Sequence, residues 1–368
     1  MSKKSKKKIS LFLPSLRGGG AERVFLNLAK GFAERGFSVD LILAQKEGAY
    51  LDKVPEGVKI VDLNSRRILY SLFPLVRYLK KEQPDVLLSA IFHVNIISVL
   101  AILLSGSNAD LIVTEHNPFS ITQKKLPLWE RFIVKFFMRV LYKRTKAVVT
   151  VSKGVAEDLK SLGLNSKNFK VIYNPMDIAD IKKKAKEDPK HEWLENKSQP
   201  ILLGVGRLTY QKDFAMLIKA FSKICKNTDA RLIILGEGEE RKNLQKLVNK
   251  LGLQDHVDMP GFVDNPYAYM SKAEVFVLSS RYEGFGNVLV EAMACGTPVV
   301  STNCPVGPSE ILDKGKYGKL VPVGDVEAME KAIIETLHNL KLSADELQKR
   351  ASHFSVERAT DRYLQLID

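Results

Sequence analysis

The stretch Glu274–Val300, EVFVLSSRYEGFGNVLVEAMACGTPVV, carries the pattern that decides the fold. An apolar run of strand length, EVFVLSS, opens it, and TPVV begins a second such run at its end. Between the two runs a loop, RYEGFG, leads into NVLVEAMACG, which we interpret as a helix. Strand, loop, helix and strand in this order indicate parallel strands joined by a helical crossover.

The same alternation extends along most of the chain. Strands are expected at Ile9–Pro14, Val39–Ala44, Asp85–Ala90, Leu111–Glu115, Ala147–Val151, Lys170–Tyr173, Ile201–Val205, Arg231–Leu235, His256–Met259, Glu274–Leu278, Pro298–Ser301 and Lys319–Val321. Helices are expected at Ala21–Arg35, His93–Leu104, Leu128–Thr145, Phe214–Lys226, Glu239–Leu251, Asn287–Cys295 and Val326–His338. Continuous apolar strands separated by helices indicate parallel sheets covered on both faces.

One break in this alternation divides the chain. Ile181–Gln199 is rich in lysine, contains Pro189 and has no strand pattern, so we expect a linker there. We therefore predict an α/β protein with two doubly wound, Rossmann-like domains, residues 1–185 and 186–354. Each domain should have a crevice at the carboxyl ends of its strands, and a ligand between them would meet loops from both.

Composition narrows the class of protein. The apolar run Val94–Leu104 is shorter than the roughly 18 residues that a membrane span needs, and Ile9–Pro14 is too short for a signal peptide. The three cysteines have no CxxC spacing, which suits a cytoplasmic protein without disulfides or zinc. The net charge of +14 indicates either a phosphate-bearing or anionic partner or a lysine-rich solvated surface.

The helix start after the RYEGFG loop has the features of an anion site. Gly284 and Gly286 allow close approach of the backbone to a ligand. The free N–H groups of Asn287 and Val288 would point into the crevice, with the positive end of the helix behind them. This arrangement suits a pyrophosphate group.

Two acids near this helix start, Glu283 and Glu291, suggest a ligand that also carries hydroxyl groups. A carboxylate accepts paired hydrogen bonds from neighbouring sugar hydroxyls, so one acid could bind a transferred sugar and the other a ribose. The alternative is that Glu283 is an N-cap and Glu291 a solvated helix residue.

Cations follow the strand Ile201–Val205. Gly206 and Arg207 end that strand and Lys212 lies five residues further on. Cations at a strand end could neutralise a diphosphate, both bound and leaving. The alternative is that they are ordinary exposed loop residues.

Taken together, these motifs resemble family 4 of the retaining glycosyltransferases, which have two Rossmann-like domains facing across a cleft (the GT-B fold). The resemblance rests on Gly206-Arg207 with Lys212, LGEGEER at Leu235–Arg241, PGFV at Pro260–Val263, EGFGNVLVEAMACGTPVV at Glu283–Val300, GGGAER at Gly18–Arg23, and Tyr173-Asn174-Pro175 with Asp177. It keeps the motif order and spans nearly the whole chain.

The resemblance implies a role for each matching residue. Glu283 would contact the transferred sugar, Glu291 the ribose, and Arg207 with Lys212 the diphosphate. His116 matches a strand-end histidine that faces the sugar, although a strand-end histidine is also commonly structural. Catalytic roles are thus expected for Glu283, His116, Arg207 and Lys212, and donor-binding roles for Gly19, Gly20, Gly206, Gly236, Glu237, Val263, Gly284, Phe285, Gly286, Asn287, Val288 and Glu291. Residues 355–368 would form a closing helix that crosses back to the first domain.

Two segments of the first domain combine cations with large apolar residues. In Leu128–Arg144, the cations Arg131, Lys135, Arg139 and Lys143 recur every four residues along one stripe. Arg66–Lys81 likewise combines arginine and lysine residues with large apolar residues. With the basic Met1–Lys8, both favour peripheral attachment to the anionic inner face of the cell membrane, although Leu128–Arg144 could equally be a core helix with a solvated edge.

The sequence therefore predicts a retaining hexosyl- or N-acetylhexosaminyltransferase that uses a nucleoside diphosphate sugar, with UDP favoured by the resemblance. The acceptor would be a lipid-linked or other glycan in bacterial surface polysaccharide or glycan assembly. No DxD motif ends a strand and Gly18–Gly20 lacks GxGxxG spacing, so neither a metal nor a cofactor is expected. No basic face with interleaved aromatic residues suggests nucleic acid. The alternatives are a nucleotide-sugar epimerase of the same architecture and a non-enzymatic basic membrane-binding protein.

Overall fold

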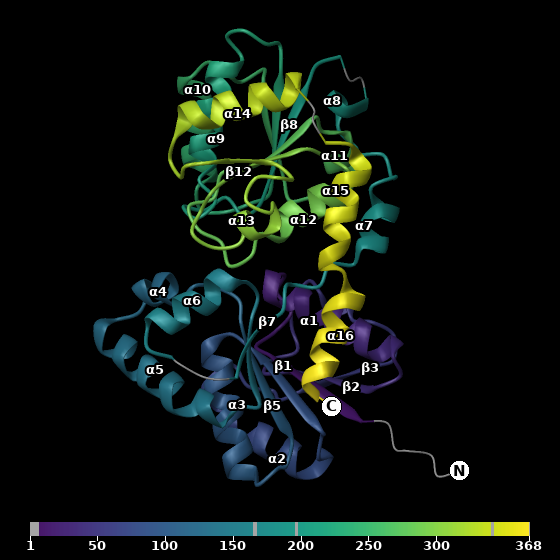
Figure 1. The fold of residues 1–368 in the computed structure, drawn as a ribbon, viewed down its shortest axis with the longest axis vertical. Coiled ribbons are helices and arrows are strands. Elements are labelled where there is room, and N and C mark those ends of the chain that lie inside the picture. The colour runs from purple at the N-terminus through teal and green to yellow at the C-terminus, as the bar shows by residue number, and fades with distance from the viewer. Residues whose placement is uncertain (1–6, 165–167, 196–197, 340–341, 368) are drawn as a thin grey trace. The chain divides into compact units, whose positions relative to one another are not determined.

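The chain forms two compact units, each built around its own parallel sheet (Figure 1). The computed structural model describes residues 7–164, 168–195, 198–339 and 342–367. Unit 1 comprises Met1–Met176 with Val356–Asp368, and unit 2 comprises Asp177–Ser355. The basic residues 1–6 and residue 368 lie outside the described part of the chain.

Unit 1 contains a seven-stranded sheet in the order β3-β2-β1-β4-β5-β6-β7, in which every recorded pairing is parallel. Its strands are β1 (Lys8–Leu13), β2 (Ser38–Leu43), β3 (Val58–Asp62), β4 (Val86–Ala90), β5 (Asp110–Glu115), β6 (Ala147–Thr150) and β7 (Phe169–Val171). The strand order reverses between β1 and β4, and this is the point where doubly wound sheets open a ligand crevice.

Unit 2 contains a six-stranded parallel sheet in the order β10-β9-β8-β11-β12-β13. Its strands are β8 (Ile201–Val205), β9 (Arg231–Leu235), β10 (Val257–Gly261), β11 (Val275–Leu278), β12 (Val299–Thr302) and β13 (Lys319–Val321). Here the order reverses between β8 and β11, so the loops that follow these two strands share one edge of the sheet.

Helices cover the sheets and complete two apolar cores, one in each unit. In unit 1 the α-helices are α1 (Gly20–Glu34), α2 (Leu72–Glu82), α3 (Phe92–Ser105), α4 (Phe119–Thr122), α5 (Leu128–Leu141), α6 (Lys153–Ser161) and α16 (Val356–Ile367), with short 3-10 turns that include η2 (Ile68–Ser71) and η4 (Tyr142–Arg144). In unit 2 they are α7 (Ile178–Lys184), α8 (Glu192–Glu195), α9 (Phe214–Ile224), α10 (Arg241–Lys250), α11 (Pro266–Lys272), α12 (Asn287–Ala294), α13 (Pro308–Ile311), α14 (Val326–His338) and α15 (Ala344–Ala351).

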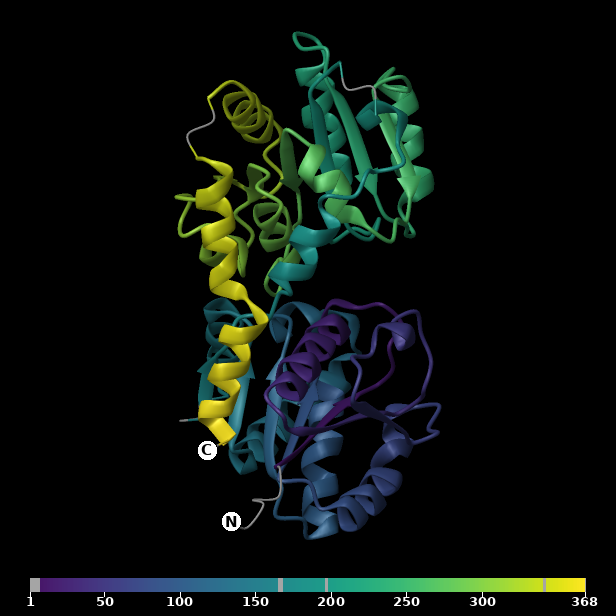
Figure 2. The ribbon, with the colours of Figure 1, turned by 90° about the vertical axis from the view of Figure 1, so that its right-hand side faces the viewer.

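The C-terminal helix α16 packs against α1 within unit 1, as Figures 1 and 2 both show. The packing is close because α1 carries a glycine at the crossing point. A Cβ atom added to Gly31 would lie 2.1 Å from Oγ1 of Thr360 and 2.9 Å from Cγ1 of Val356. Glycine at this position therefore permits the two helices to meet.

The doubly wound α/β architecture predicted from the sequence is confirmed, and each expected strand is present within two residues of its predicted ends. One strand, β3, was missed because its sequence VKIVD is only partly buried and lacks a continuous apolar run. The prediction of a linker at Ile181–Gln199 was wrong for its described residues, which belong to unit 2. Ile181 of α7 and Leu194 of α8 are buried there, so short helices occupy much of this segment.

Candidate functional site

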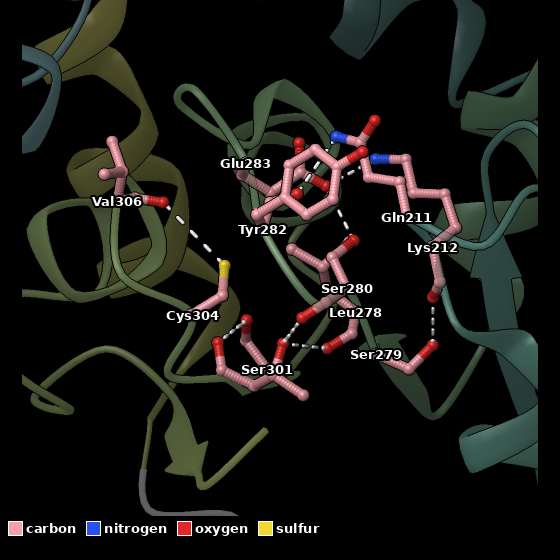
Figure 3. Close-up of polar contacts among 11 residues, drawn as sticks. Gln211, Lys212, Leu278, Ser279, Ser280, Tyr282, Glu283, Ser301, Cys304 and Val306 are labelled. Carbon is pink, nitrogen blue, oxygen red and sulfur yellow. Dashed lines mark hydrogen bonds and ion pairs between the residues drawn. The ribbon is translucent and has the colours of Figure 1, made fainter. Parts of the chain in front are cut away.

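The loops that follow β8 and β11 in unit 2 meet at a group of polar side chains, which Figure 3 shows with residues from β12 and the loop after it. At their centre the Nζ atom of Lys212 lies 2.5 Å from Oε1 of Glu283, and both side chains are largely buried. The hydroxyl of Ser280 donates a second hydrogen bond to the same oxygen at 2.6 Å. A buried, hydrogen-bonded carboxylate with its own cation is fixed in position before any ligand arrives.

The structure excludes the alternative interpretation of each of these two residues. Glu283 is not an N-cap, because the N-cap of α12 is Gly286. Lys212 is not an ordinary exposed loop residue, because only 17% of its side chain is exposed. Arg207, by contrast, is exposed, as the alternative interpretation also expected.

Further hydrogen bonds join the two loops along their length (Figure 3). The Ser279 hydroxyl donates to the carbonyl of Lys212 at 2.8 Å, and the Gln211 side-chain amide donates to the carbonyl of Tyr282 at 2.9 Å. The N–H of Arg281 donates to the carbonyl of Gln211 at 2.8 Å. These contacts link residues about seventy positions apart, so nothing in the local sequence indicated them.

An ion pair between a partly exposed arginine and a buried aspartate holds the base of the first loop. Asp213 adopts a left-handed backbone conformation, with φ +47°, and its carboxylate lies 2.8 Å from the guanidinium of Arg281. That guanidinium also lies over the ring of Tyr210, 4.4 Å from its centroid. Sequence reasoning missed this pair, because its members are adjacent only after β8 and β11 come together.

Glycine conformations shape the start of α12. Gly286 has φ +103°, which a residue with a side chain rarely adopts. Gly307 approaches the same loop so closely that a Cβ there would lie 1.9 Å from the carbonyl oxygen of Phe285. Asn287 and Val288, whose N–H groups open the helix, are partly buried. The predicted helix start is therefore present at Asn287, four residues after Glu283.

Glu291 lies inside α12 and is 1% exposed, so the alternative of a solvated helix residue is wrong. Gly284 and Phe285 are also buried, and the ring of Phe285 packs edge-on against that of Phe354. Burial of a carboxylate is costly unless other groups stabilise it. The burial of Glu291 therefore distinguishes it from the acidic residues that make a helix surface soluble.

The remaining predicted donor-site residues of unit 2 lie at the ends of β8, β9 and β10. Gly236 has φ +135°, and a Cβ there would lie 2.0 Å from the carbonyl oxygen of Gly206, so the two backbones touch. Glu237 is exposed and its carboxylate pairs with Arg241 at 2.9 Å. Val263 is partly buried after β10.

Cys304 lies close to this site but is unsuited to act as a nucleophile. Its thiol donates weakly to the carbonyl of Val306 (Figure 3). Burial, with a smaller contribution from the charge of Glu283, raises the pKa of the Cys304 thiol to about 12. A protonated thiol is a poor nucleophile. Within the described part of the chain, no three histidine, cysteine, aspartate or glutamate residues group as metal ligands would.

In unit 1, the glycine-rich loop after β1 leads into α1. Gly19 is the N-cap of α1 and Gly20 is its first residue. The carboxylate of Glu22 accepts hydrogen bonds from the N–H groups of Gly18 at 2.6 Å and Gly19 at 2.9 Å. These two N–H groups are therefore occupied by a carboxylate of the chain itself.

His116 directly follows β5 in unit 1 and is buried, with 9% exposure. Its Nε2 atom lies 2.9 Å from the hydroxyl of Thr114, and its ring packs 6.2 Å from that of Phe25. Burial lowers the pKa of His116 to about 4, so the imidazole is neutral at pH 7. The side chain can exchange hydrogen bonds but carries no charge.

The helix α5 is not a core helix with a solvated edge, because within it only Met138 and Leu141 are buried. Its exposed apolar residues are Leu128, Trp129, Phe132, Ile133, Phe136, Phe137 and Val140. The neighbouring helix α3 packs against α5, α2 and η2, and it exposes Leu103 and Leu104. Leu69, Tyr70 and Phe73 of η2 and α2 are also exposed. We call this set of exposed residues the apolar surface of unit 1.

The four cations predicted to form a stripe along Leu128–Arg144 differ in their contacts and burial, and Lys143 lies in η4. Arg131 donates to the carbonyls of Leu126 and Lys124, and Arg139 donates to that of Leu162. Lys135 is partly buried and Lys143 is exposed. None of the described helices combines the length and apolar character needed to cross a bilayer.

The fold has two doubly wound units, and comparison with known proteins identifies the class of this protein. The model for glycosyl transferases group 1 matches residues 185–353, and the model for glycosyltransferase family 4 matches residues 18–180. The chain is a glycosyltransferase with the GT-B fold and belongs to family 4.

Similar curated proteins act in the assembly of lipid-linked and surface glycans. The chain is 32% identical, over 91% of each chain, to a Campylobacter jejuni N-acetylgalactosamine-N,N'-diacetylbacillosaminyl-diphospho-undecaprenol 4-alpha-N-acetylgalactosaminyltransferase. It is 30% identical to the lipopolysaccharide core biosynthesis glycosyltransferase LpsE of Rhizobium meliloti, over 95% of this chain and 96% of that protein.

Solved structures share the fold at lower identity. A glycosyltransferase from Rickettsia africae has a TM-score of 0.81 at 22% identity, covering 99% of this chain and 98% of the other. Anabaena Alr3699/HepE, solved in complex with UDP and glucose, has a TM-score of 0.80 at 22% identity, covering 98% of both chains.

Proposed function

We propose that this glycosyltransferase moves a hexose or N-acetylhexosamine from a UDP-sugar to a hydroxyl of a lipid-linked glycan, with retention of anomeric configuration and without a metal. The observation that carries the donor assignment is the buried Lys212–Glu283 pair beside the start of α12, at the point where the strand order of unit 2 reverses. A cation, a fixed carboxylate and the N–H groups of a helix start are the groups that a diphosphate sugar requires.

The roles within unit 2 follow from the chemistry of each group. Oε1 of Glu283 already accepts from Lys212 and Ser280, so a sugar hydroxyl would use Oε2. Arg207, which is exposed and free to reorient, would bind the diphosphate together with Lys212. The N–H groups at the start of α12 would stabilise the charge that develops on the leaving phosphate.

The same arrangement favours a mechanism without a covalent sugar–enzyme intermediate. A nucleophile must be free and deprotonated, yet Glu283 is engaged by a cation and a hydroxyl, and the Cys304 thiol is protonated. The leaving phosphate would then help to deprotonate the acceptor hydroxyl, which attacks from the same face of the sugar. That route retains configuration.

Two observations support a lipid-linked acceptor at a membrane surface. The Campylobacter relative is named for an acceptor that carries diphospho-undecaprenol. The apolar surface of unit 1 places exposed aromatic and aliphatic side chains beside exposed cations, among them Arg77 and Lys143. Such a surface suits shallow insertion into an anionic membrane on its cytoplasmic face.

Glu283→Gln and Arg207→Ala test the donor site. We expect Glu283→Gln to lower kcat by about 100-fold or more with little change in UDP affinity, because a contact that acts on the transferred sugar is lost. Arg207→Ala should weaken UDP binding itself by about 10-fold. Calorimetric titration with UDP and transfer from UDP-N-acetylgalactosamine to a diphospho-undecaprenol-linked glycan measure the two effects.

Glu239→Ala and Lys242→Ala, both exposed in unit 2, serve as matched controls and should change neither quantity. Near-normal transfer by Glu283→Gln would contradict the assignment of the sugar contact. Release of a converted sugar nucleotide when the acceptor is omitted would indicate the epimerase alternative.

A further inference from the structure

A continuous set of buried hydrogen bonds surrounds His116 in unit 1. The hydroxyl of Thr114 donates to the carbonyl of Ser89 at 2.9 Å and also contacts Nε2 of His116 at 2.9 Å. Thr114 and Ser89 are both 0% exposed, and they lie on the adjacent strands β5 and β4. No water competes for these bonds at such positions, so hydrogen counting decides their directions.

The count assigns the proton on the imidazole. A threonine hydroxyl has one hydrogen, and the Ser89 carbonyl can only accept, so that hydrogen points to Ser89. Toward His116 the Thr114 oxygen can then only accept, which requires a hydrogen on Nε2. Because burial lowers the pKa of His116 to about 4, the ring carries no second hydrogen at neutral pH. Its Nδ1 atom is therefore a hydrogen-bond acceptor.

Other buried groups keep Thr114 and Ser89 in these roles. The Ser89 hydroxyl donates to Oδ1 of Asn95 at 2.8 Å, which fixes the orientation of the Asn95 amide. The Nδ2 group of Asn95 donates to the Thr114 carbonyl at 3.0 Å and to Oε1 of Glu115 at 2.9 Å. The hydroxyl of Tyr142, directly after α5, donates to the same Glu115 oxygen.

We propose that Thr114 is a positioning residue, which holds His116 as the Nε2–H tautomer so that Nδ1 accepts a hydrogen bond from a hydroxyl of the sugar substrate. The sugar as ligand rests on the proposed function, whereas the tautomer rests on unit 1 alone. Among the described residues, the hydrogen bond recorded for the His116 ring involves Nε2 and not Nδ1, so Nδ1 is the atom that the proposal assigns to the ligand. The opposite tautomer would present a donor to the same hydroxyl.

Nuclear magnetic resonance tests the tautomer without substrate. In ¹⁵N-labelled protein at pH 7, the couplings between ring C–H protons and ring nitrogens distinguish Nε2–H from Nδ1–H imidazoles, and His116→Gln identifies the signals. We expect wild type and Thr114→Ser to show the Nε2–H pattern, and Thr114→Val to show a mixture. His191 is an internal reference, because its Nδ1 accepts from the N–H of Trp193 and its Nε2 faces Asp258. A proton on Nδ1 in wild type, or no change in Thr114→Val, would overturn the proposal.

A double-mutant cycle tests the effect on the reaction with UDP-N-acetylgalactosamine and the diphospho-undecaprenol-linked glycan. Thr114→Val should lower kcat by about 3- to 10-fold, the effect of one lost hydrogen bond, and Thr114→Ser should restore it. In a His116→Ala background the same change should alter kcat by less than about 2-fold, because there is no ring left to position. An equal loss in both backgrounds would show that Thr114 acts only on stability.

The two experiments separate this inference from the proposed function. Failure to transfer sugar from any nucleotide donor would refute the function, and the coupling pattern would still decide the tautomer. Thermal melting of Thr114→Ser and Thr114→Val confirms that both variants are folded at the assay temperature.

Discussion

At Glu283 a single carboxylate oxygen accepts from both Lys212 and Ser280, at 2.5 and 2.6 Å. The sequence predicted both charged residues as site components but not their pairing with each other. A carboxylate held by two donors keeps its orientation when a ligand leaves, which is the preorganisation that transition-state stabilisation requires. Ser280 had no sequence signal of its own, because a serine at a strand end is common.

The buried residues Glu115 and His116 are neighbours whose proton binding changes in opposite directions on folding. Burial raises the pKa of Glu115 from 4.5 to about 7, and hydrogen bonds from Tyr142 and Asn95 partly oppose that rise. Burial lowers the pKa of His116 from 6.5 to about 4. Between pH 4.5 and 7 the folded protein retains a proton on Glu115 that the unfolded chain has released, so this contribution to the free energy of unfolding falls as pH rises. For His116, between pH 4 and 6.5, the unfolded chain holds the extra proton, so its contribution rises with pH.

Substitution of one residue should therefore reveal the pH dependence of stability that the other contributes. Between pH 4.5 and 6.5, the free energy of unfolding of Glu115→Gln should rise with pH relative to wild type, by up to about 1.4 kcal/mol per pH unit. His116→Asn should change in the opposite direction over the same range. Urea denaturation at half-unit pH steps measures both, and variant curves parallel to wild type would contradict the assigned pKa shifts.

At the scale of the element, the contact between α1 and α16 depends on a residue without a side chain. Gly31→Ala would place a Cβ 2.1 Å from Oγ1 of Thr360, so the helices must separate. We expect the free energy of unfolding to fall by about 1–3 kcal/mol, the usual cost of overpacking. Chemical denaturation measures the change, with Glu34→Ala on the exposed face of α1 as the control. An equal effect of both substitutions would contradict this account.

The helix α5 shows how one pattern can favour two structures. Its cations and large apolar residues fit either a core helix or an interfacial one, and only the exposure of residues such as Phe132, at 75%, decides between them. Periodicity reports which residues share a face, but it does not report whether another element covers that face.

Membrane attachment through α5 predicts that removal of one exposed aromatic side chain weakens binding to vesicles. Phe132→Ser should weaken binding to vesicles that contain anionic phosphatidylglycerol by about 10-fold, because an exposed aromatic side chain no longer enters the interface. Cosedimentation measures the partition coefficient. Phe262→Ser removes a similarly exposed aromatic residue from unit 2 and should have no effect. Equal losses for the two variants would contradict a role for the apolar surface.

At the scale of the molecule, each unit has its own sheet and core, so a ligand of one unit should stabilise that unit. UDP at about 100 times its Kd adds about 2.7 kcal/mol, which should raise the melting temperature of unit 2 by about 5–10 °C. Differential scanning calorimetry of the whole chain measures this shift. UDP should raise the melting temperature of one transition, and Gly31→Ala should lower that of the other. A single transition that responds to both changes would contradict separate stabilisation of the two units.

The amino-acid sequence by itself determined the alternation of strands and helices, the division into two Rossmann-like halves and the residues of the family motifs. These features are local, because apolar runs, glycines and short spacings can be recognised without knowledge of distant contacts. It missed β3, whose half-exposed residues give a weak pattern, and it misjudged Ile181–Gln199, where single buried residues anchor short helices.

Only the tertiary structure decided which groups are partners. Lys212 and Glu283 meet because β8 lies next to β11 in the sheet, and Thr114 reaches the Ser89 carbonyl because β5 lies next to β4. Hydrogen bonds act over about 3 Å and join residues that the fold brings together from distant positions in the chain. The chemical character of each site residue was therefore visible in the sequence, whereas its protonation, burial and orientation were set by neighbours that the sheet order supplied.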